Sequence, residues 1–263
     1  MTAASAIPQS DRQPLRLVGA VPSEAIAVRR LTVQYRDVLA LDNVSVNFRP
    51  GRLTGSIGPN GAGKSTLIKA MLGLIPATSG QVTTRGKALL EQRANIAYVP
   101  QRSQIDWRYP ATVWDVVLMG RTQQAGWFRR FSATSRHIAA TALDRVGMAD
   151  FKNRPIGQLS GGQQQRVFLA RALAQEADIF CFDEPFVGVD QTTETILFDT
   201  FKELTNARKT VIVVNHDLGE SITHFDDLLL LNRTVVATGP RHQVLNRENL
   251  NAAYGSPVQF YAA

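Results

Sequence analysis

The sequence predicts an α/β fold, a sheet with crossover helices that is interrupted by a helical segment. Short apolar runs rich in β-branched residues alternate with helical patterns, and a glycine-rich loop stands between one such run and a helix. From about 102 to 170 the strand-like runs are replaced by helical patterns and turns. The strand candidates, in chain order, are Leu53–Ile57, Asn95–Val99, Asp178–Phe182, Thr210–Asn215 and Asp227–Leu231.

Composition and charge narrow the class of protein. The chain has 263 residues, 44% of them hydrophobic, which is enough for one or two globular domains. No run approaches the roughly 18 consecutive apolar residues that a membrane span needs. The single cysteine, Cys181, cannot form an internal disulfide, which favours a reducing compartment. The net charge of +7 favours an anionic partner, either nucleic acid, nucleotide or an anionic membrane surface.

A phosphate-binding loop is predicted after the first strand candidate. The segment GPNGAGKS fits the pattern G-x-x-x-x-G-K-[ST] and lies between Leu53–Ile57 and a helical pattern that continues toward Pro76. Glycines allow the backbone N–H groups to face a phosphate, Lys64 can reach the β and γ phosphates, and the Ser65 hydroxyl can ligate Mg²⁺. The predicted cradle consists of Gly58, Pro59, Asn60, Gly61, Ala62, Gly63, Lys64, Ser65 and Thr66.

Two carboxylates follow the strand candidate Asp178–Phe182. Ligands of open α/β sheets bind at the carboxyl ends of the strands, and Asp183 lies at such an end, so it is placed to hold Mg²⁺. Glu184 is the candidate general base for an attacking water, a role worth about 10²–10⁴ in rate. Alone, the pair is also compatible with a solvated acidic turn before Pro185, and the phosphate loop favours the catalytic interpretation.

A second anion-binding segment is predicted at LSGGQ, before a helical pattern. The free N–H groups at a helix start attract anions. One nucleotide is already enclosed by the first loop, so the second segment is expected to serve a nucleotide held by another copy of the chain. Its residues are Ser160, Gly161, Gly162 and Gln163.

Taken together, these motifs make the chain similar to the ATP-binding subunits of ABC transporters over about residues 25–239. The resemblance also includes Gln101, the sequence FDEP, the turn ending at Asp190 and His216. It implies a P-loop NTPase (RecA-like) core with an N-terminal antiparallel β subdomain and an inserted α-helical subdomain. The implied organisation is a flexible tail (1–24), the first part of the nucleotide-binding core (25–101), a helical subdomain ending in LSGGQ (102–170), the second part of the core (171–240) and a C-terminal tail (241–263).

The resemblance also implies roles for single residues around ATP and Mg²⁺. Tyr35 matches the aromatic residue that stacks on adenine, Gln101 the residue that senses Mg²⁺ and water, and His216 the histidine that contacts the γ-phosphate. Asp190 matches the residue that crosses the dimer interface. Taken one by one, Tyr35 is also compatible with strand packing, Gln101 with a surface loop and His216 with a core histidine. A homodimer is expected to hold two ATP molecules, each site completed by Ser160–Gln163 of the other chain.

Within ABC transporters the helical segment resembles the importers of manganese, zinc or chelated iron, with the manganese branch favoured. The resemblance rests on the stretch from Trp107 to Arg121 and on GWFRR at 126–130. It implies a peripheral subunit on the cytoplasmic face of the plasma (inner) membrane, with a separate permease and an extracytoplasmic metal-binding protein as partners. Other solutes remain alternatives, as does a soluble ABC ATPase acting on nucleic acid or the ribosome, although no nucleic acid is expected. The aromatic residues from Trp107 to Trp114 are expected either to line the permease docking groove or to form the core of the subdomain.

Overall fold

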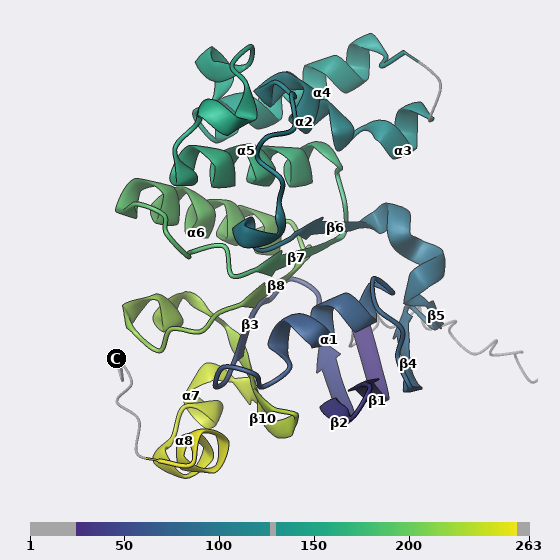
Figure 1. Cartoon of the computed structure of the whole chain (residues 1–263), viewed down its shortest axis with the longest axis vertical. Helices are drawn as coiled ribbons and strands as arrows, with labels where there is room; N and C mark the ends of the chain where they lie inside the picture. Colours follow the sequence, from purple (N-terminus) through teal and green to yellow (C-terminus); the bar gives the residue numbers. More distant parts are fainter. Residues whose placement is uncertain (1–24, 127–129, 257–263) are drawn as a thin grey trace, which may run out of the picture.

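The computed structural model describes residues 25–126 and 130–256, which form two β-sheets and a helical subdomain (Figure 1). Three predicted features lie outside these residues: the tail 1–24, the aromatic pair at 127–128 and the end of the C-terminal tail. In the two described ranges, no helix is both long enough and apolar enough to cross a bilayer.

The central sheet has six strands in the order β10-β9-β3-β8-β7-β6. The strands from β9 to β6 run parallel, and β10 pairs antiparallel with β9 at one edge. All five predicted strands are present, with ends that differ by at most one residue. The strands are β3 (Leu53–Ile57), β6 (Ile96–Val99), β7 (Ile179–Asp183), β8 (Thr210–Val214), β9 (Asp227–Asn232) and β10 (Thr234–Pro240).

A second, antiparallel sheet has the strand order β2-β1-β4-β5. It provides the antiparallel β subdomain that the resemblance implied. Its strands are β1 (Ile26–Tyr35), β2 (Val38–Phe48), β4 (Ser79–Thr84) and β5 (Lys87–Ala88).

The helix α1 (Lys64–Met71) ends before Pro76, the predicted stop. The reason is Gly73, which has a φ of +64° and lies just after the helix. Its N–H donates to the Ala70 carbonyl, and the N–H of Leu74 donates to the Lys69 carbonyl over 2.9 Å. This bonding pattern satisfies the last carbonyls of a helix and terminates it, so glycine ends α1 before proline can.

The helical subdomain is built from the segment in which strand patterns were absent. Its helix α5 extends to Ala174, past position 170. Figure 1 shows α5 and α6 on one side of the central sheet and α1 on the other. The helices after α1 are α2 (Val113–Met119), α3 (Thr122–Ala125), α4 (Ala133–Arg145), α5 (Gly161–Ala174), α6 (Gln191–Asn206), α7 (Arg241–Val244) and α8 (Arg247–Tyr254). Short 3-10 helices cover Leu89–Asn95, Arg102–Gln104, Ala149–Phe151, Ile156–Gln158 and Glu220–His224.

The central sheet is covered on both faces, so its inner strands are buried throughout. Along β7 the side chains alternate between the two faces. Phe180 and Phe182 pack in the core cluster that includes α5 and α6, whereas Ile179 and Cys181 pack in the cluster that includes α1. Burial raises the pKa of the Cys181 thiol to about 12. Cys181 is therefore an inert core residue, as predicted.

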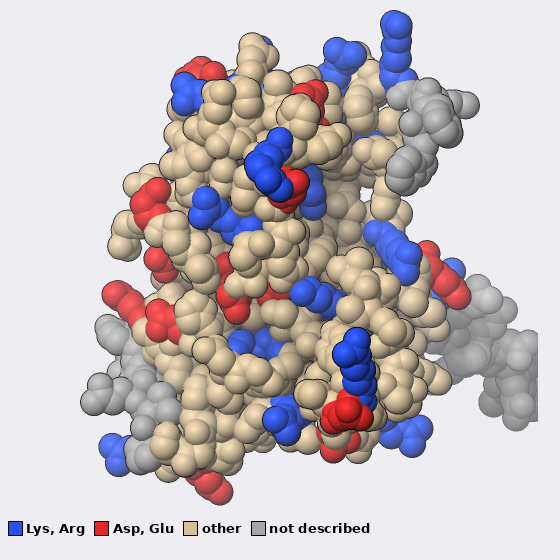
Figure 2. Space-filling view, in the orientation of Figure 1, with Lys and Arg blue, Asp and Glu red and all other residues tan. Residues whose placement is uncertain are grey.

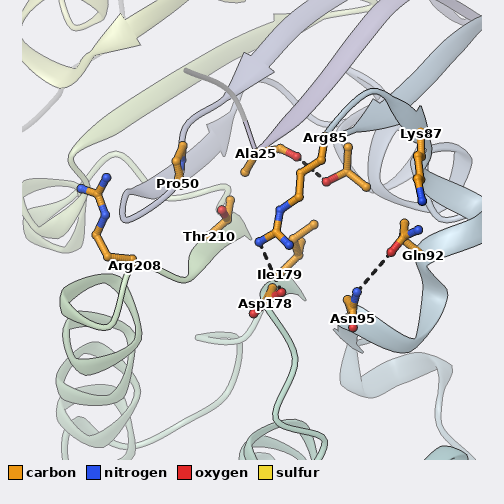
Figure 3. A pocket seen from close by; sticks show the side chains of 11 residues that line it. Ala25, Pro50, Arg85, Lys87, Gln92, Asn95, Asp178, Ile179, Arg208 and Thr210 are labelled. Carbon is orange, nitrogen blue, oxygen red and sulfur yellow. Dashed lines mark hydrogen bonds and ion pairs between the residues drawn. The ribbon is translucent and has the colours of Figure 1, made fainter. Parts of the chain in front are cut away.

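A pocket lined by ion-paired side chains lies between the two sheets, at the end of β7 away from the phosphate loop (Figure 3). Its volume is about 390 Å³. The Asp178 carboxylate accepts from Lys209 Nζ over 2.7 Å and from the Arg85 guanidinium over 3.5 Å. Because Arg85 follows β4 and Asp178 precedes β7, this cluster links the antiparallel sheet to the parallel one.

Candidate nucleotide-binding site

The predicted phosphate loop lies between β3 and α1 and is shaped by glycine. Gly58 has a φ of +145°, and a Cβ there would lie 2.0 Å from the Leu231 carbonyl oxygen. Gly63, at the start of α1, has a φ of +93°, and its Cβ would lie 2.6 Å from the Ala40 carbonyl oxygen. Neither position tolerates another residue without moving backbone, so the sequence glycines are required for this loop geometry.

The Lys64 ammonium lies inside the loop. It is buried, and Nζ donates to the carbonyl oxygens of Gly58 over 2.7 Å and Pro59 over 3.0 Å. Burial lowers the pKa of Lys64, while the negative charges of Glu184 and Asp183 act in the opposite direction. The loop therefore holds a cation at its centre, with acidic groups close enough to influence it.

Asp183 ends β7 next to the start of α1. Its carboxylate is buried and accepts from Ser65 Oγ over 2.6 Å. The Tyr98 hydroxyl donates to its other oxygen over 3.4 Å, and burial together with Asp183 holds the pKa of Tyr98 well above its usual range. Tyr98 was not among the predicted site residues, since its role depends on β6 lying beside β7.

Ser65 and Asp183 present a hydroxyl and a carboxylate oxygen, the hard donors that Mg²⁺ prefers. Across the described residues there is no cluster of three or more His, Cys, Asp or Glu side chains suited to a metal ion. Mg²⁺ is commonly held by one or two protein oxygens together with substrate phosphates. The donor set therefore fits the ion that the sequence predicted.

Glu184 adopts a left-handed backbone conformation, with a φ of +51°. Non-glycine residues rarely adopt this region, and it costs roughly 1–3 kcal/mol. The backbone N–H of Glu184 donates to the Val214 carbonyl over 3.2 Å, and its carboxylate accepts from Gln101 Nε2 over 2.6 Å. The structure thus brings together two residues that were predicted separately, 83 positions apart.

The LSGGQ segment lies at the N-terminus of α5. Ser160 and Gln163 form a capping box, in which each side chain accepts a hydrogen bond from the other residue's backbone N–H. Gly162 is buried against the turn before α6, and a Cβ there would lie 2.6 Å from Asp190 Oδ2. Asp190 caps α6 through the Thr193 N–H, and this hydrogen bond is the main reason that its pKa is lowered. Gly162 and Asp190 of one chain are therefore adjacent.

Two other predicted residues are exposed. Tyr35 ends β1 and is 44% exposed. His216 is exposed after β8, next to the buried Asn215, whose side-chain amide donates to the Asp217 carbonyl over 3.1 Å. No hydrogen bond in the described ranges joins either side chain to the phosphate loop. Their positions leave both rings accessible.

Comparison with known proteins identifies the family. The profile of the ABC transporter family matches residues 41–187. The chain is 48% identical over 236 residues to a manganese transport system ATP-binding protein of Listeria monocytogenes, with 89% of this chain and 98% of that protein covered. It is 47% identical to a zinc transport system ATP-binding protein of Treponema pallidum, with 89% and 88% covered.

Solved structures agree with this assignment. An inward-facing putative metal-chelate type ABC transporter superimposes with a TM-score of 0.78 at 27% identity, covering 89% of this chain and 90% of that one. A bacterial ABC transporter cassette in its dimeric form superimposes with a TM-score of 0.73 at 28% identity, covering 82% and 98%. The chain therefore belongs to the ABC transporter family, and it is an ATP-hydrolysing cassette of that family.

Proposed function

We propose that this chain powers the uptake of a transition metal ion, with manganese as the first candidate, through a separate membrane permease. The observation that carries the choice of cargo is the 48% identity to a manganese transport subunit over 98% of that protein's length. The zinc relative is almost as similar, at 47%, so zinc is the second candidate. The ATPase does not touch the cargo, and the experiment must therefore include the partners that do.

In this proposal the phosphate loop binds ATP and the two carboxylates after β7 perform separate tasks. Lys64 neutralises the β and γ phosphates, and its position inside the loop supports this role. Ser65 and Asp183 would hold Mg²⁺, which when bound neutralises phosphate charge. Glu184 orients the attacking water and accepts its proton, and its hydrogen bond with Gln101 supports a shared place beside the γ-phosphate.

Two copies of the chain are proposed to enclose two ATP molecules. Within one chain, the Ser160–Gln163 capping box satisfies only part of the α5 terminus, and the first N–H groups of a helix have no intrahelical acceptor. Ser160 is exposed and Gly161 is half-buried, so a second molecule can reach these donors. Asp190 is exposed beside them and is proposed to contact the partner as well. In the same arrangement Tyr35 stacks on adenine and His216 contacts the γ-phosphate.

On the face seen in Figure 2, the distribution of charge supports a nucleotide and a membrane complex over nucleic acid. Figure 2 shows basic and acidic side chains interspersed on this face of the molecule, without one continuous basic surface. Nucleic-acid proteins usually gather their positive charge into a stripe or patch. We propose, from the family resemblance, that the subunit lies at the cytoplasmic side of the membrane, bound to its permease.

The aromatic residues of the helical subdomain divide between core and surface. Trp107 packs edge-to-face on Phe168, with ring centroids 5.6 Å apart, and Trp114 also packs against the core. Tyr109 between them is 62% exposed, and Met119 is 45% exposed. We propose that Tyr109 contacts the permease, so Tyr109→Arg should abolish transport and leave ATPase activity without the permease within about twofold. A loss of that ATPase activity would contradict this assignment.

The decisive experiment reconstitutes the cassette with its permease in liposomes and adds a metal-loaded extracytoplasmic binding protein. Hydrolysis is measured with the manganese-loaded and the zinc-loaded forms, and metal uptake is measured in parallel. Stimulation by the manganese-loaded form supports the proposal, whereas stimulation by the zinc-loaded form alone transfers it to the second candidate. No stimulation together with tight, salt-sensitive nucleic-acid binding would contradict a transport role.

A further inference from the structure

Arg102, the residue after Gln101, connects the nucleotide site to the LSGGQ helix. Its Nε donates to Gln164 Oε1 in α5 over 2.8 Å. Its guanidinium also lies against Gly161, where a Cβ would meet the guanidinium carbon at 3.1 Å, and 5.6 Å from the centre of the Trp107 ring. A single side chain thus contacts the start of α5 and the far end of its own loop.

The backbone reinforces this connection at the other end of the loop. Trp107 Nε1 donates to the Arg102 carbonyl over 3.2 Å. The Trp107 carbonyl oxygen approaches Gly157 so closely that a Cβ there would lie 2.4 Å away. The Trp107 ring packs on Phe168 of α5. The segment from 102 to 107 is therefore fixed at both ends to the segment from 156 to 168, and we call this contact the loop–helix clasp.

Gln164 makes the clasp sensitive to the identity of residue 102. Its side chain is 3% exposed, and its Nε2 donates to the Ile156 carbonyl over 3.2 Å. Gln164 Oε1 accepts from Arg102, so removal of the guanidinium leaves a buried carbonyl oxygen without that donor. Lysine carries the same charge but lacks the planar group that donates to Gln164 and faces the Trp107 ring.

Gln101, the residue before Arg102, contacts the proposed general base. Gln101 donates to the Glu184 carboxylate over 2.6 Å, and the next side chain along the chain holds α5. A movement of the Gln101 backbone relative to Glu184 would therefore act on a segment that is fixed to the LSGGQ helix. In the proposed dimer that helix serves the nucleotide bound by the other copy.

We propose that Arg102 is a positioning residue for hydrolysis, which keeps Gln101 and the LSGGQ helix in a fixed relative position so that the two nucleotide sites act together. This inference rests on the proposed two-site dimer. Arg102 touches neither nucleotide in this account, and it acts through Gln101 on one side and Gly161 and Gln164 on the other. Its loss should lower turnover and the cooperativity between sites, and should spare ATP binding by one phosphate loop.

The test compares Arg102→Lys and Arg102→Met with the wild type in steady-state ATPase assays over a range of ATP concentrations. We expect kcat to fall at least about fivefold, since a small displacement of positioned groups can cost up to about 10²-fold in rate, and the Hill coefficient to move toward 1. The matched control is Arg108→Lys, since Arg108 is an exposed arginine of the same loop and, among the residues that the structure describes, its side chain pairs only with Asp106. Binding of a fluorescent ATP analogue to the monomer should stay within about twofold in all variants.

A double mutant separates the clasp from a general loss of stability. If Arg102 acts through Gln164, the combination Arg102→Met with Gln164→Leu should lower kcat no further than Arg102→Met alone. Multiplicative losses, or an Arg102→Lys variant with unchanged kcat and Hill coefficient, would overturn the inference. If the wild type hydrolyses ATP without cooperativity and never dimerises with nucleotide, the two-site dimer itself fails, and the two failures are thereby distinguished.

Discussion

The substitution Glu184→Gln tests the proposed chemistry most directly. The amide has nearly the shape of the carboxylate, and its oxygen can still accept from Gln101 Nε2, which now lies 2.6 Å from the carboxylate oxygen. The left-handed backbone at this position, with a φ of +51°, is also unchanged in cost because neither residue is glycine. The variant therefore keeps the local geometry and loses the capacity to accept a proton from water.

The expected loss is the contribution of a positioned general base, about 10²–10⁴ in kcat. This corresponds to about 3–5 kcal/mol of transition-state stabilisation at 1.36 kcal/mol for each tenfold change. ATP binding should be retained, because Lys64 and the loop backbone are untouched. With hydrolysis blocked, the nucleotide-bound dimer should accumulate.

The assay combines phosphate release at saturating ATP and Mg²⁺ with the mass of the protein in solution, measured with and without ATP. Glu248→Gln is the matched control, since Glu248 is an exposed carboxylate in the first turn of α8. The control should hydrolyse ATP at the wild-type rate. A Glu184→Gln variant with wild-type turnover would refute the assignment of the base, and one that stays monomeric at every ATP concentration would refute the dimer.

Three further predictions follow from particular contacts. Glu184→Gly should be more stable than Glu184→Ala by about 1 kcal/mol in thermal unfolding, because only glycine adopts a φ of +51° without strain, and equal stability would contradict that strain. Asp227→Asn should lower the free energy of unfolding at pH 7 by about 1–2 kcal/mol, since the buried carboxylate accepts from Arg49 and Arg52. Although burial alone raises the pKa of Asp227, these arginines hold it below its usual value, so its contribution is present above about pH 4 and is lost as the pH falls further; a difference from wild type that persists at pH 2 would contradict this account. Gly58→Ala should abolish ATP binding, measured by nucleotide titration, because its Cβ would lie 2.0 Å from a backbone oxygen, and normal affinity would show that the loop is less confined.

Most strands of the central sheet could be predicted from the sequence, because the pattern that marks them lies within each strand. Strands that are buried on both faces appear as uninterrupted apolar runs, so Ile179–Asp183 and Thr210–Val214 were located to within one residue. The end of α1 was predicted at Pro76, but Gly73 ends the helix first through its left-handed conformation. The antiparallel strands came from the family resemblance, since their exposed, irregular pairings produce no comparable run.

The contacts within the site were beyond the sequence for a different reason. The family resemblance located Gln101 and the end of an apolar strand located Glu184, but their hydrogen bond depends on strand order, which places β6 beside β7. Tyr98 reaches Asp183 through the same adjacency. Arg102 is an ordinary polar residue until α5 folds against its loop. The sequence gives the identity of each residue, whereas these hydrogen-bond partners depend on tertiary packing.

Two adjacent carboxylates at the end of β7 make contacts in two different directions, one with the phosphate loop and its helix and one with the helical subdomain. Residues alternate along a strand, so Asp183 lies on the same face as Cys181, the face covered by α1, and there it meets Ser65. The chain then turns into the left-handed conformation at Glu184, and that carboxylate meets Gln101 at the entrance to the helical subdomain. Of these two adjacent residues, Asp183 thus contacts the phosphate-loop side of the site and Glu184 contacts the start of the helical subdomain. The left-handed backbone at Glu184, which costs roughly 1–3 kcal/mol, lies at the point where these two sets of contacts divide.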